Sequence, residues 1–408
     1  MKKLFSLGLA LILAVALLGS ALAEDVTITY ATFSASGAQE ETLKKMVEVF
    51  ESKNPGIKVD VQLTGYEDYF TKLATTVGGG NAPDVFEMNM ENFLAYMLRN
   101  ACADLSGLVD SANYSEGTLA AVSADGKLYA VPVSFSTCVL FYNKALFDQA
   151  GVDYPNDSWT WNDAQAAAEK IAALGDDIWG FYQPISYNEF YKAVKGNGGS
   201  LLNEDYTAFT VNSPENVAVL DAMLARVRGD GHVMPNKEEM AGRGDWDLFT
   251  EGKLGMLISG IWGFQTFSEK CTFDWDIVVE PGYAQKSTFF FANVNCVSPS
   301  SQKQEAAAKF ADAMGSDPDI VKLRLDASWE LPTIADQSKL KQYLEVTPPA
   351  NRKAVFDSMD FAAAPPALLE QGAVSEIIGN VLGTLETNDM TAQEALDEIQ
   401  AQLEDADL

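Results

Sequence analysis

The stretch "VPVSFSTCVLFY", Val131 to Tyr142, says most about the fold of this chain. It is long and apolar, as a buried strand is, but Pro132 and the polar run at residues 134–137 interrupt it. A few residues that absorb backbone rotation are enough to form a hinge. We therefore interpret this stretch as a strand that passes from one domain to another, and we expect the crossing at residues 134–137.

Upstream of this stretch, strand patterns alternate with helix patterns. Apolar residues recur every second position at 26–30 and 57–63, and at helical spacing at 43–50 and 66–77. A further strand begins at Asp84. The order strand, helix, strand, helix, strand predicts an α/β fold with a parallel sheet.

Polar residues follow two of these strands. Open α/β sheets bind ligands beyond the carboxyl ends of their strands. This rule points to Ser34 and Ser36 after the first strand, and to Glu87 and Asn89 at the third. A helix cap or a solvated surface position is the competing interpretation of each of these residues.

Local signals on both sides of the crossing mark further elements. Asp125-Gly126 between short apolar runs indicates a hairpin. Thr160 and Asp163 form a capping box for a helix that begins at Trp161. Amphipathic patterns predict helices at 217–227 and 305–314.

The first 23 residues have the pattern of a secretory signal. A basic start precedes an apolar run at 4–18, and Ala21-Leu22-Ala23 fits the small-residue rule for cleavage. We expect cleavage after Ala23 and an exported, periplasmic or extracellular protein. An uncleaved membrane anchor is the alternative, although the run is shorter than the roughly 18 residues that a spanning helix needs.

Composition narrows the class of protein. The 385 residues after the signal predict two domains. The formal net charge of −30 disfavours nucleic acid and anionic membranes as partners. A single histidine and the absence of a CxxC pair or a P-loop predict no metal site and no cofactor. Three disulfide pairings or free buried thiols remain open for the cysteines, which are Cys102, Cys138, Cys271 and Cys296.

Six segments, taken in order, resemble one known family. They are "NPGIKVDVQ" at 54–62, "GGGNAPDVF" at 78–86, "DGKLYAVPVSFSTCVLFYNKALFDQAG" at 125–151, "SWTWNDA" at 158–164, "FTEGKLGMLISGIWGF" at 249–264 and "EAAAKFADAM" at 305–314. In this order, after a signal peptide, they resemble the sugar-binding extracellular solute-binding proteins of ABC transporters, the maltose-binding-protein-like family. The resemblance covers the whole chain after the signal.

The resemblance implies a type II periplasmic-binding-protein fold, in which two α/β lobes are joined by a hinge of several segments and enclose a ligand cleft. Lobe one would comprise residues 24–135 and 292–330, and lobe two would comprise 138–290 and 331–408. Further crossings would fall at 289–293 and 329–332.

The family also implies site residues at matching positions. Trp262, in "SGIW", would stack on a sugar ring, and a buried core position is the alternative. Ser136 near the hinge, together with Tyr187 and Asn188 from lobe two, would contact the ligand. Glu67, at the start of the second helix, would reach the cleft or be a solvated first-turn residue.

We therefore expect a monomeric, non-enzymatic receptor that binds a sugar or oligosaccharide and delivers it to the membrane permease of an ABC importer. Peptides, polyamines or uronates are the alternative ligands, and an inward-pointing Arg243 would favour a uronate. A secreted glycoside hydrolase, which needs two carboxylates across a cleft, is the alternative from another class.

Overall fold

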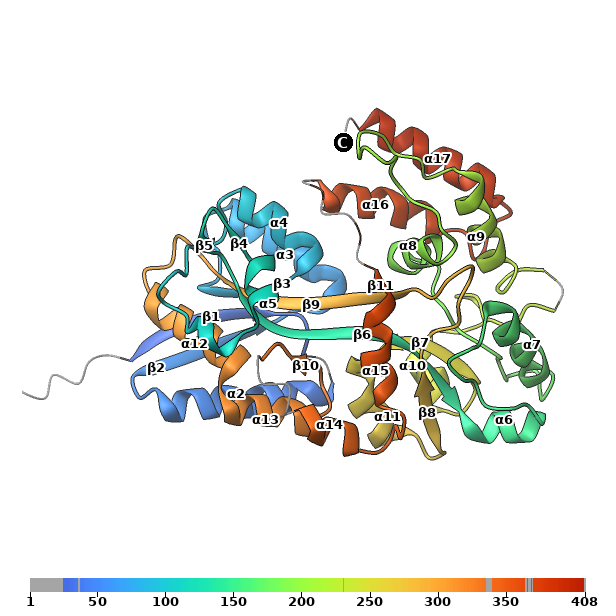
Figure 1. Cartoon of the computed structure of the whole chain (residues 1–408), viewed down its shortest axis with the longest axis horizontal. Helices are drawn as coiled ribbons and strands as arrows, with labels where there is room; N and C mark the ends of the chain where they lie inside the picture. Colours follow the sequence, from blue (N-terminus) through green and yellow to red (C-terminus); the bar gives the residue numbers. More distant parts are fainter. Residues whose placement is uncertain are drawn as a thin grey trace, which may run out of the picture.

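The computed structural model describes residues 25–35, 37–229, 231–334, 340–363, 365, 368 and 370–406, without the side chains of Ala38 and Glu67. The expected signal peptide at 1–23 lies outside the described residues. The described chain forms two lobes that are joined by long strands (Figure 1). No described helix is long and apolar enough to cross a membrane.

Lobe one contains the predicted alternation of strands and helices. β1 pairs in parallel with β2 and with β3, so the βαβαβ prediction is confirmed. The predicted hairpin at Asp125-Gly126 is confirmed as well, because β4 pairs with β5 around it. The elements are β1 (Val26–Thr32), α2 (Ala38–Lys53), β2 (Ile57–Leu63), α3 (Tyr66–Gly78), β3 (Val85–Asn89), α4 (Met90–Leu98), η1 (Ser111–Asn113), α5 (Glu116–Ala121), β4 (Ser123–Ala124) and β5 (Lys127–Leu128).

Strand β6 (Val131–Asn143) runs from one lobe into the other and is buried along its whole length (Figure 1). Up to Thr137 it pairs with β9, and from Cys138 it pairs with β7 and β8. The polar residues at 134–137 continue the strand without a break, and the strand changes partners directly after them, at Thr137 and Cys138. The irregularity lies instead between Pro132 and Ser134, where the register shifts, because proline cannot donate to the ladder.

Lobe two follows β6 and has the capping box that the sequence predicts. The hydroxyl of Thr160 accepts from the amide of Asp163, whose carboxylate accepts from Thr160 in return. The elements are α6 (Lys144–Ala150), α7 (Trp161–Ala172), α8 (Tyr187–Gly196), α9 (Pro214–Leu224), α10 (Asp245–Thr250), β7 (Met256–Gly260), η2 (Ile261–Gly263), α11 (Phe264–Lys270), β8 (Trp275–Val278) and β9 (Thr288–Val297).

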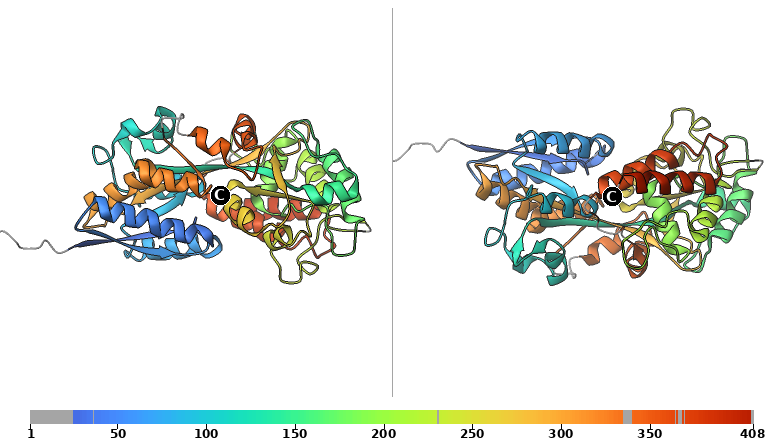
Figure 2. Two further views of the ribbon diagram at one scale, coloured as in Figure 1. Left: turned by 90° about the horizontal axis from the view of Figure 1, so that it is seen from below. Right: turned by 90° about the horizontal axis from the view of Figure 1, so that it is seen from above.

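Strand β9 carries the chain back to lobe one, where it pairs with β3. The chain then turns back toward lobe two, and its last two helices lie over α8 and α9 (Figures 1 and 2). The elements are α12 (Gln304–Ser316), α13 (Pro318–Asp326), β10 (Leu331–Pro332), α14 (Lys341–Glu345), α15 (Lys353–Asp357), η4 (Ser358–Phe361), β11 (Ala362–Ala363), α16 (Gln371–Leu382) and α17 (Ala392–Asp405).

The sheet order places three hinge segments side by side. The order β10-β6-β9-β3-β1-β2 puts β10 and β9 on either side of β6. Separate apolar clusters fill the two lobes, two in lobe one and one that spans lobe two. The lobe boundaries that the resemblance implied stay a prediction. All four cysteines are free thiols, and Cys102 lies within hydrogen-bond reach of Cys296.

Candidate functional site

A cavity of about 410 Å³ lies between the lobes, beside the hinge strands. Both lobes and the hinge contribute to it, since α2 and α3 belong to lobe one, α8 and η2 to lobe two, and β9 to the hinge. The residues that line it are Phe33, Ser34, Gln39, Tyr66, Asn89, Asn188, Trp246, Trp262, Phe291, Asn293 and Glu330.

We call this first cavity the central cavity. A second cavity of about 300 Å³, which we call the annex, continues it. The two cavities share the lining residues Tyr66, Asn89 and Asn188. Its lining also includes residues of α3, α4 and α16 and the start of α8, which are Phe70, Glu91, Asn92, Ser186, Tyr187, Gln371, Gly372 and Ser375.

Trp262 forms part of the wall of the central cavity, as the sequence predicts, and its side chain is partly exposed. Its ring meets Phe291 edge-on, with centroids 5.2 Å apart. Gly260 makes room for this ring, because a Cβ on Gly260 would lie 2.0 Å from it. The absence of a side chain at Gly260 therefore gives space to the tryptophan ring itself.

Ser34 lines the central cavity, and the carboxylate of Glu87 fixes its backbone through a hydrogen bond. Glu87 is buried and is not part of the lining. Its carboxylate accepts from Thr32 Oγ1 at 2.5 Å and from the backbone amides of Phe33 and Ser34 at 3.2 Å each. The carboxyl end of β1 is thereby fixed to β3, which places Ser34 at the cavity.

Asn89 and Asn188 line both cavities, and Tyr187 lines the annex. The side chain of Asn89 caps α4 by accepting from the amide of Asn92, so the cap and the cavity position that the sequence left as alternatives coexist. Burial raises the pKa of Tyr187 to about 12, although a hydrogen bond with Gln371 lowers it.

Four predicted contacts, Glu87 among them, are not among the described lining residues. Ser136 is buried in β6, where its hydroxyl donates to the carbonyl of Thr137 at 3.4 Å. The burial of its strand inside the sheet explains this position. Ser36 and the side chain of Glu67 lie outside the described residues, so those predictions stay open.

Glu330 lines the central cavity and was not singled out from the sequence. It is buried, and its carboxylate accepts from the hydroxyl of Ser134 and from Asn293 Nδ2 at 3.3 Å. Burial raises its pKa, and the Arg324 guanidinium, 3.7 Å away, opposes that rise. Only the pairing of β10 with β6 brings Glu330 to the cavity, so no local pattern could have revealed it.

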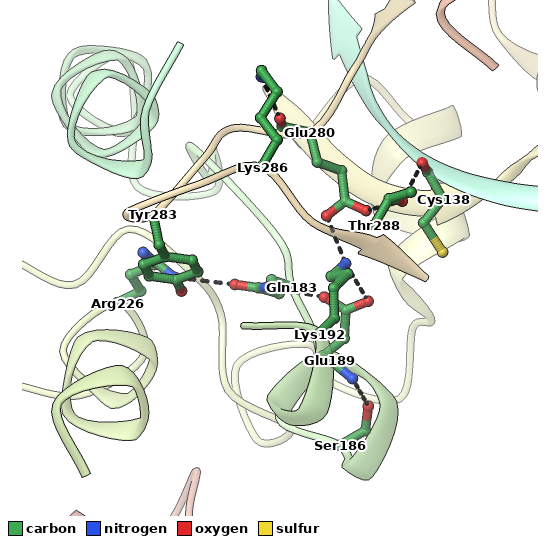
Figure 3. Close-up of polar contacts among 10 residues, drawn as sticks. All are labelled: Cys138, Gln183, Ser186, Glu189, Lys192, Arg226, Glu280, Tyr283, Lys286 and Thr288. Carbon is green, nitrogen blue, oxygen red and sulfur yellow. Dashed lines mark hydrogen bonds and ion pairs between the residues drawn. The ribbon is translucent and has the colours of Figure 1, made fainter. Parts of the chain in front are cut away.

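Helix α8, which carries Tyr187 and Asn188, is tied to the hinge by a buried charge network (Figure 3). Lys192 pairs with Glu189 at 2.7 Å and with Glu280 at 2.6 Å. Glu280 accepts from Thr288 Oγ1 at 2.7 Å, and the same hydroxyl lies 2.7 Å from the carbonyl of Cys138. Burial lowers the pKa of Lys192, but the two carboxylates outweigh this effect and raise it.

Polar contacts also join the two lobes directly at the site. Gln39 Nε2 of α2 donates to the backbone carbonyl of Trp262 at 2.7 Å. Arg99, just after α4, pairs with Glu370, just before α16, at 2.8 Å. In the described structure the lobes are therefore in direct contact at two places.

The charged residues in the described lining of the two cavities are all acidic. Among the described residues that line the two cavities there is no lysine, arginine or histidine, whereas Glu91 and Glu330 are acidic. Arg243, a possible cleft residue from the sequence, does not line either cavity and pairs with Asp177 at 3.3 Å and Glu251 at 3.4 Å. Within the described chain no cluster of three histidine, cysteine or acidic residues could hold a metal ion.

Comparisons with known proteins agree on one family. The family model of bacterial extracellular solute-binding proteins matches residues 34–320. An ABC substrate-binding protein of Listeria monocytogenes, solved in complex with cycloalternan, is 41% identical, with a TM-score of 0.89 over 94% of this chain and 99% of the other. Maltose-bound MalE3 of T. maritima, at 20% identity over 93% of this chain and 100% of the other, shares the fold with a TM-score of 0.80.

Curated relatives match over a shorter range. A putative binding protein of Brucella abortus is 30% identical over 60% of either chain. The arabinooligosaccharide-binding protein of Bacillus subtilis is 24% identical over 58% of this chain and 56% of its own. The chain thus spans about 60% of the length of the first curated relatives that it matches. The solved structures show the expected type II periplasmic-binding-protein fold.

Proposed function

The chain belongs to the bacterial extracellular solute-binding proteins, and on that premise we propose that it is the receptor of an ABC importer for an uncharged oligosaccharide. The sugar would bind in the central cavity and the annex and would be delivered to the membrane permease after the lobes close. Closure follows if the ligand contacts both lobes, because such a ligand stabilises the closed form by its differential affinity. The receptor is exported, acts as a monomer and performs no chemistry.

The observation that carries this proposal is the lining of the central cavity. Aromatic rings and amide side chains converge on it from both lobes and the hinge, and the rings are those of Phe33, Tyr66, Trp246, Trp262 and Phe291. The negative face of an aromatic ring suits the C–H face of a sugar. Amide groups both donate and accept hydrogen bonds, as hydroxyl groups require.

The charge of the lining separates the alternative ligands. A uronate requires a cationic partner, and Arg243 is already paired with two carboxylates outside the cavities. A polyamine would suit the acidic lining, but Glu330 is already engaged by Ser134 and Asn293. The neutral sugars bound in two similar structures, cycloalternan and maltose, support an uncharged ligand.

The mature protein should be screened by thermal shift against neutral oligosaccharides, uronates, spermidine and short peptides, followed by calorimetry. A ligand at 100 times its Kd should stabilise the fold by about 2.7 kcal/mol. Stabilisation by spermidine, peptides or uronates in place of neutral sugars would overturn the ligand class. Release of sugar products on prolonged incubation would instead identify a glycoside hydrolase.

A further inference from the structure

Two of the four cysteines lie next to each other in lobe one. Cys102 follows α4 and is 4% exposed, and Cys296 lies in β9 and is 0% exposed. Both belong to the same apolar cluster of lobe one, and their thiols lie within hydrogen-bond reach of each other. Two thiols that meet in this way form the substrate of an oxidation.

The backbone holds the two cysteines at the spacing that a disulfide needs. β3 pairs with β9, α4 follows β3, and the loop after α4 then returns to β9. There the amide of Ala103 donates to the carbonyl of Val297 at 2.8 Å, and Cys102 and Cys296 directly precede these two residues. Segments paired in this way lie about 4.8 Å apart, and a disulfide needs Cα atoms about 4.4–6.8 Å apart.

The other two cysteines belong to lobe two. Cys138 lies in β6 within the apolar cluster of that lobe, and Cys271 follows α11 and packs against the same cluster. Cys271 is partly exposed, whereas Cys138 is buried. The geometry therefore singles out Cys102 and Cys296 from the pairings that the sequence leaves open.

We propose that Cys102 and Cys296 form a disulfide while the exported chain folds. The proposal rests on the export that is part of the proposed function, because disulfides form and persist outside the cytoplasm. The oxidant is a disulfide, either small or carried by a protein. One thiolate of the pair attacks it and releases one thiol, and the second thiolate then displaces the other. The Sγ–Sγ bond forms, and the oxidant is reduced to two thiols that take up the two protons.

Burial determines when this step takes place. Burial raises the pKa of Cys296, and the neighbouring thiol of Cys102 raises it further. Because the thiolate is the nucleophile, the enclosed pair reacts slowly once the cluster has closed. Oxidation therefore belongs to folding, before water and oxidant leave the cluster. The same enclosure then protects the finished bond from reductants.

The bond would fasten one wall of the site to the hinge. The loop that Cys102 occupies ends α4, whose cap Asn89 lines both cavities, and Cys296 belongs to the hinge strand β9. A crosslink between distant positions also restricts the unfolded chain, more so for a long loop. The Tm of the oxidised protein should therefore exceed that of the reduced protein by roughly 5–10 °C.

The first experiment uses the mature protein with Cys271→Ser, which removes the partly exposed thiol. The protein is unfolded in urea and refolded with reduced and oxidised glutathione. Thiol titration in denaturant should then find one thiol, that of Cys138, and peptide mass spectrometry should find Cys102 linked to Cys296. Cys102→Ala in the same background should retain two thiols and show no link. A second experiment exports the wild-type chain with its own signal to a bacterial periplasm and alkylates free thiols at lysis.

Each outcome decides the proposal. The expected link in both experiments supports it. Three thiols after refolding, or a link that involves Cys138, would overturn it and leave Cys102 and Cys296 as core thiols. Alkylated Cys102 and Cys296 in protein recovered from the periplasm would overturn it too. A chain that stays in the cytoplasm contradicts the exported function, and refolding then decides the pairing alone. Equal Tm values for the oxidised and reduced protein would refute the stabilising role of the bond.

Discussion

The side-chain amide of Gln39 donates a 2.7 Å hydrogen bond to the backbone carbonyl of Trp262. Gln39 stands at the start of α2 in lobe one, and Trp262 lies in η2 of lobe two. The bond therefore joins two lining residues of the central cavity that would move apart if the lobes opened.

Gln39→Ala should shift the receptor toward an open form. A net hydrogen bond is worth about 0.5–1.5 kcal/mol, so ligand affinity should fall roughly 2- to 12-fold. Small-angle scattering should show a larger radius of gyration for the free variant than for wild type. Gln302→Ala, at an exposed position far from the cavity, is the control. Equal radii and equal affinities for wild type and Gln39→Ala would contradict the role of this bond.

Trp262→Ala should weaken binding much more than folding. The loss of the stacking face and of the apolar contact together should weaken the free energy of binding by about 2–4 kcal/mol. This change corresponds to a Kd that is roughly 30- to 1,000-fold higher. Trp161→Ala provides the contrast, because Trp161 is a buried core residue whose loss should cost about 3–5 kcal/mol of stability. Calorimetry and melting curves on both variants check this. A large drop in Tm for Trp262→Ala with intact affinity would assign Trp262 to packing.

Gly260→Ala should displace the ring of Trp262. A Cβ at this position would lie 2.0 Å from the ring, so the indole must move out of the cavity wall. Affinity should fall by about the same factor as for Trp262→Ala, since the same stacking face is lost. Gly379→Ala, in α16 with open space around its Cα, should bind like wild type. A crystal structure of Gly260→Ala with an unmoved Trp262 would refute this explanation.

Lys192→Met should destabilise lobe two, because it leaves Glu189 and Glu280 buried without their cation. Removing one partner of a buried pair costs about 3–5 kcal/mol, which urea unfolding can measure. Lys195→Met, on the same helix, should change stability by less than about 1 kcal/mol, because the charge of Lys195 only approaches the ring of Tyr191, at 6.0 Å from its centroid. Similar urea midpoints of unfolding for the two variants would show that the buried charge network contributes little to the stability of the fold.

The pH dependence of unfolding should report on Glu91. Its pKa is raised from 4.5 to about 7 in the folded state, so its contribution to stability is fully present below pH 4.5 and is lost as the pH rises through 7. The loss is at most about 3 kcal/mol. The free energy of unfolding of Glu91→Gln should therefore fall less than that of wild type between pH 4.5 and 7.5. Identical slopes would place the Glu91 carboxyl in a hydrated environment.

The sequence predicted the elements of this protein wherever a short-range rule applies. Alternating and helical spacing of apolar residues predicted the βαβαβ unit, since each period corresponds to one backbone geometry. The capping box at Thr160 follows equally directly from hydrogen-bond chemistry within one turn. The order of the six family segments predicted the two-lobe fold and the cavity position of Trp262.

Tertiary structure alone decided which polar residues face the cavities. Glu87, near the end of β3, and Ser136, in the middle of β6, are both buried, so neither side chain is free to face the cavities. Glu330 reaches the central cavity only because β10 pairs with β6. Glu91 and Gln371 lie far apart in the sequence and meet only because α16 returns to contact α4. Local sequence patterns do not predict such contacts. The contacts depend on how distant segments pack and on which side chains that packing removes from water.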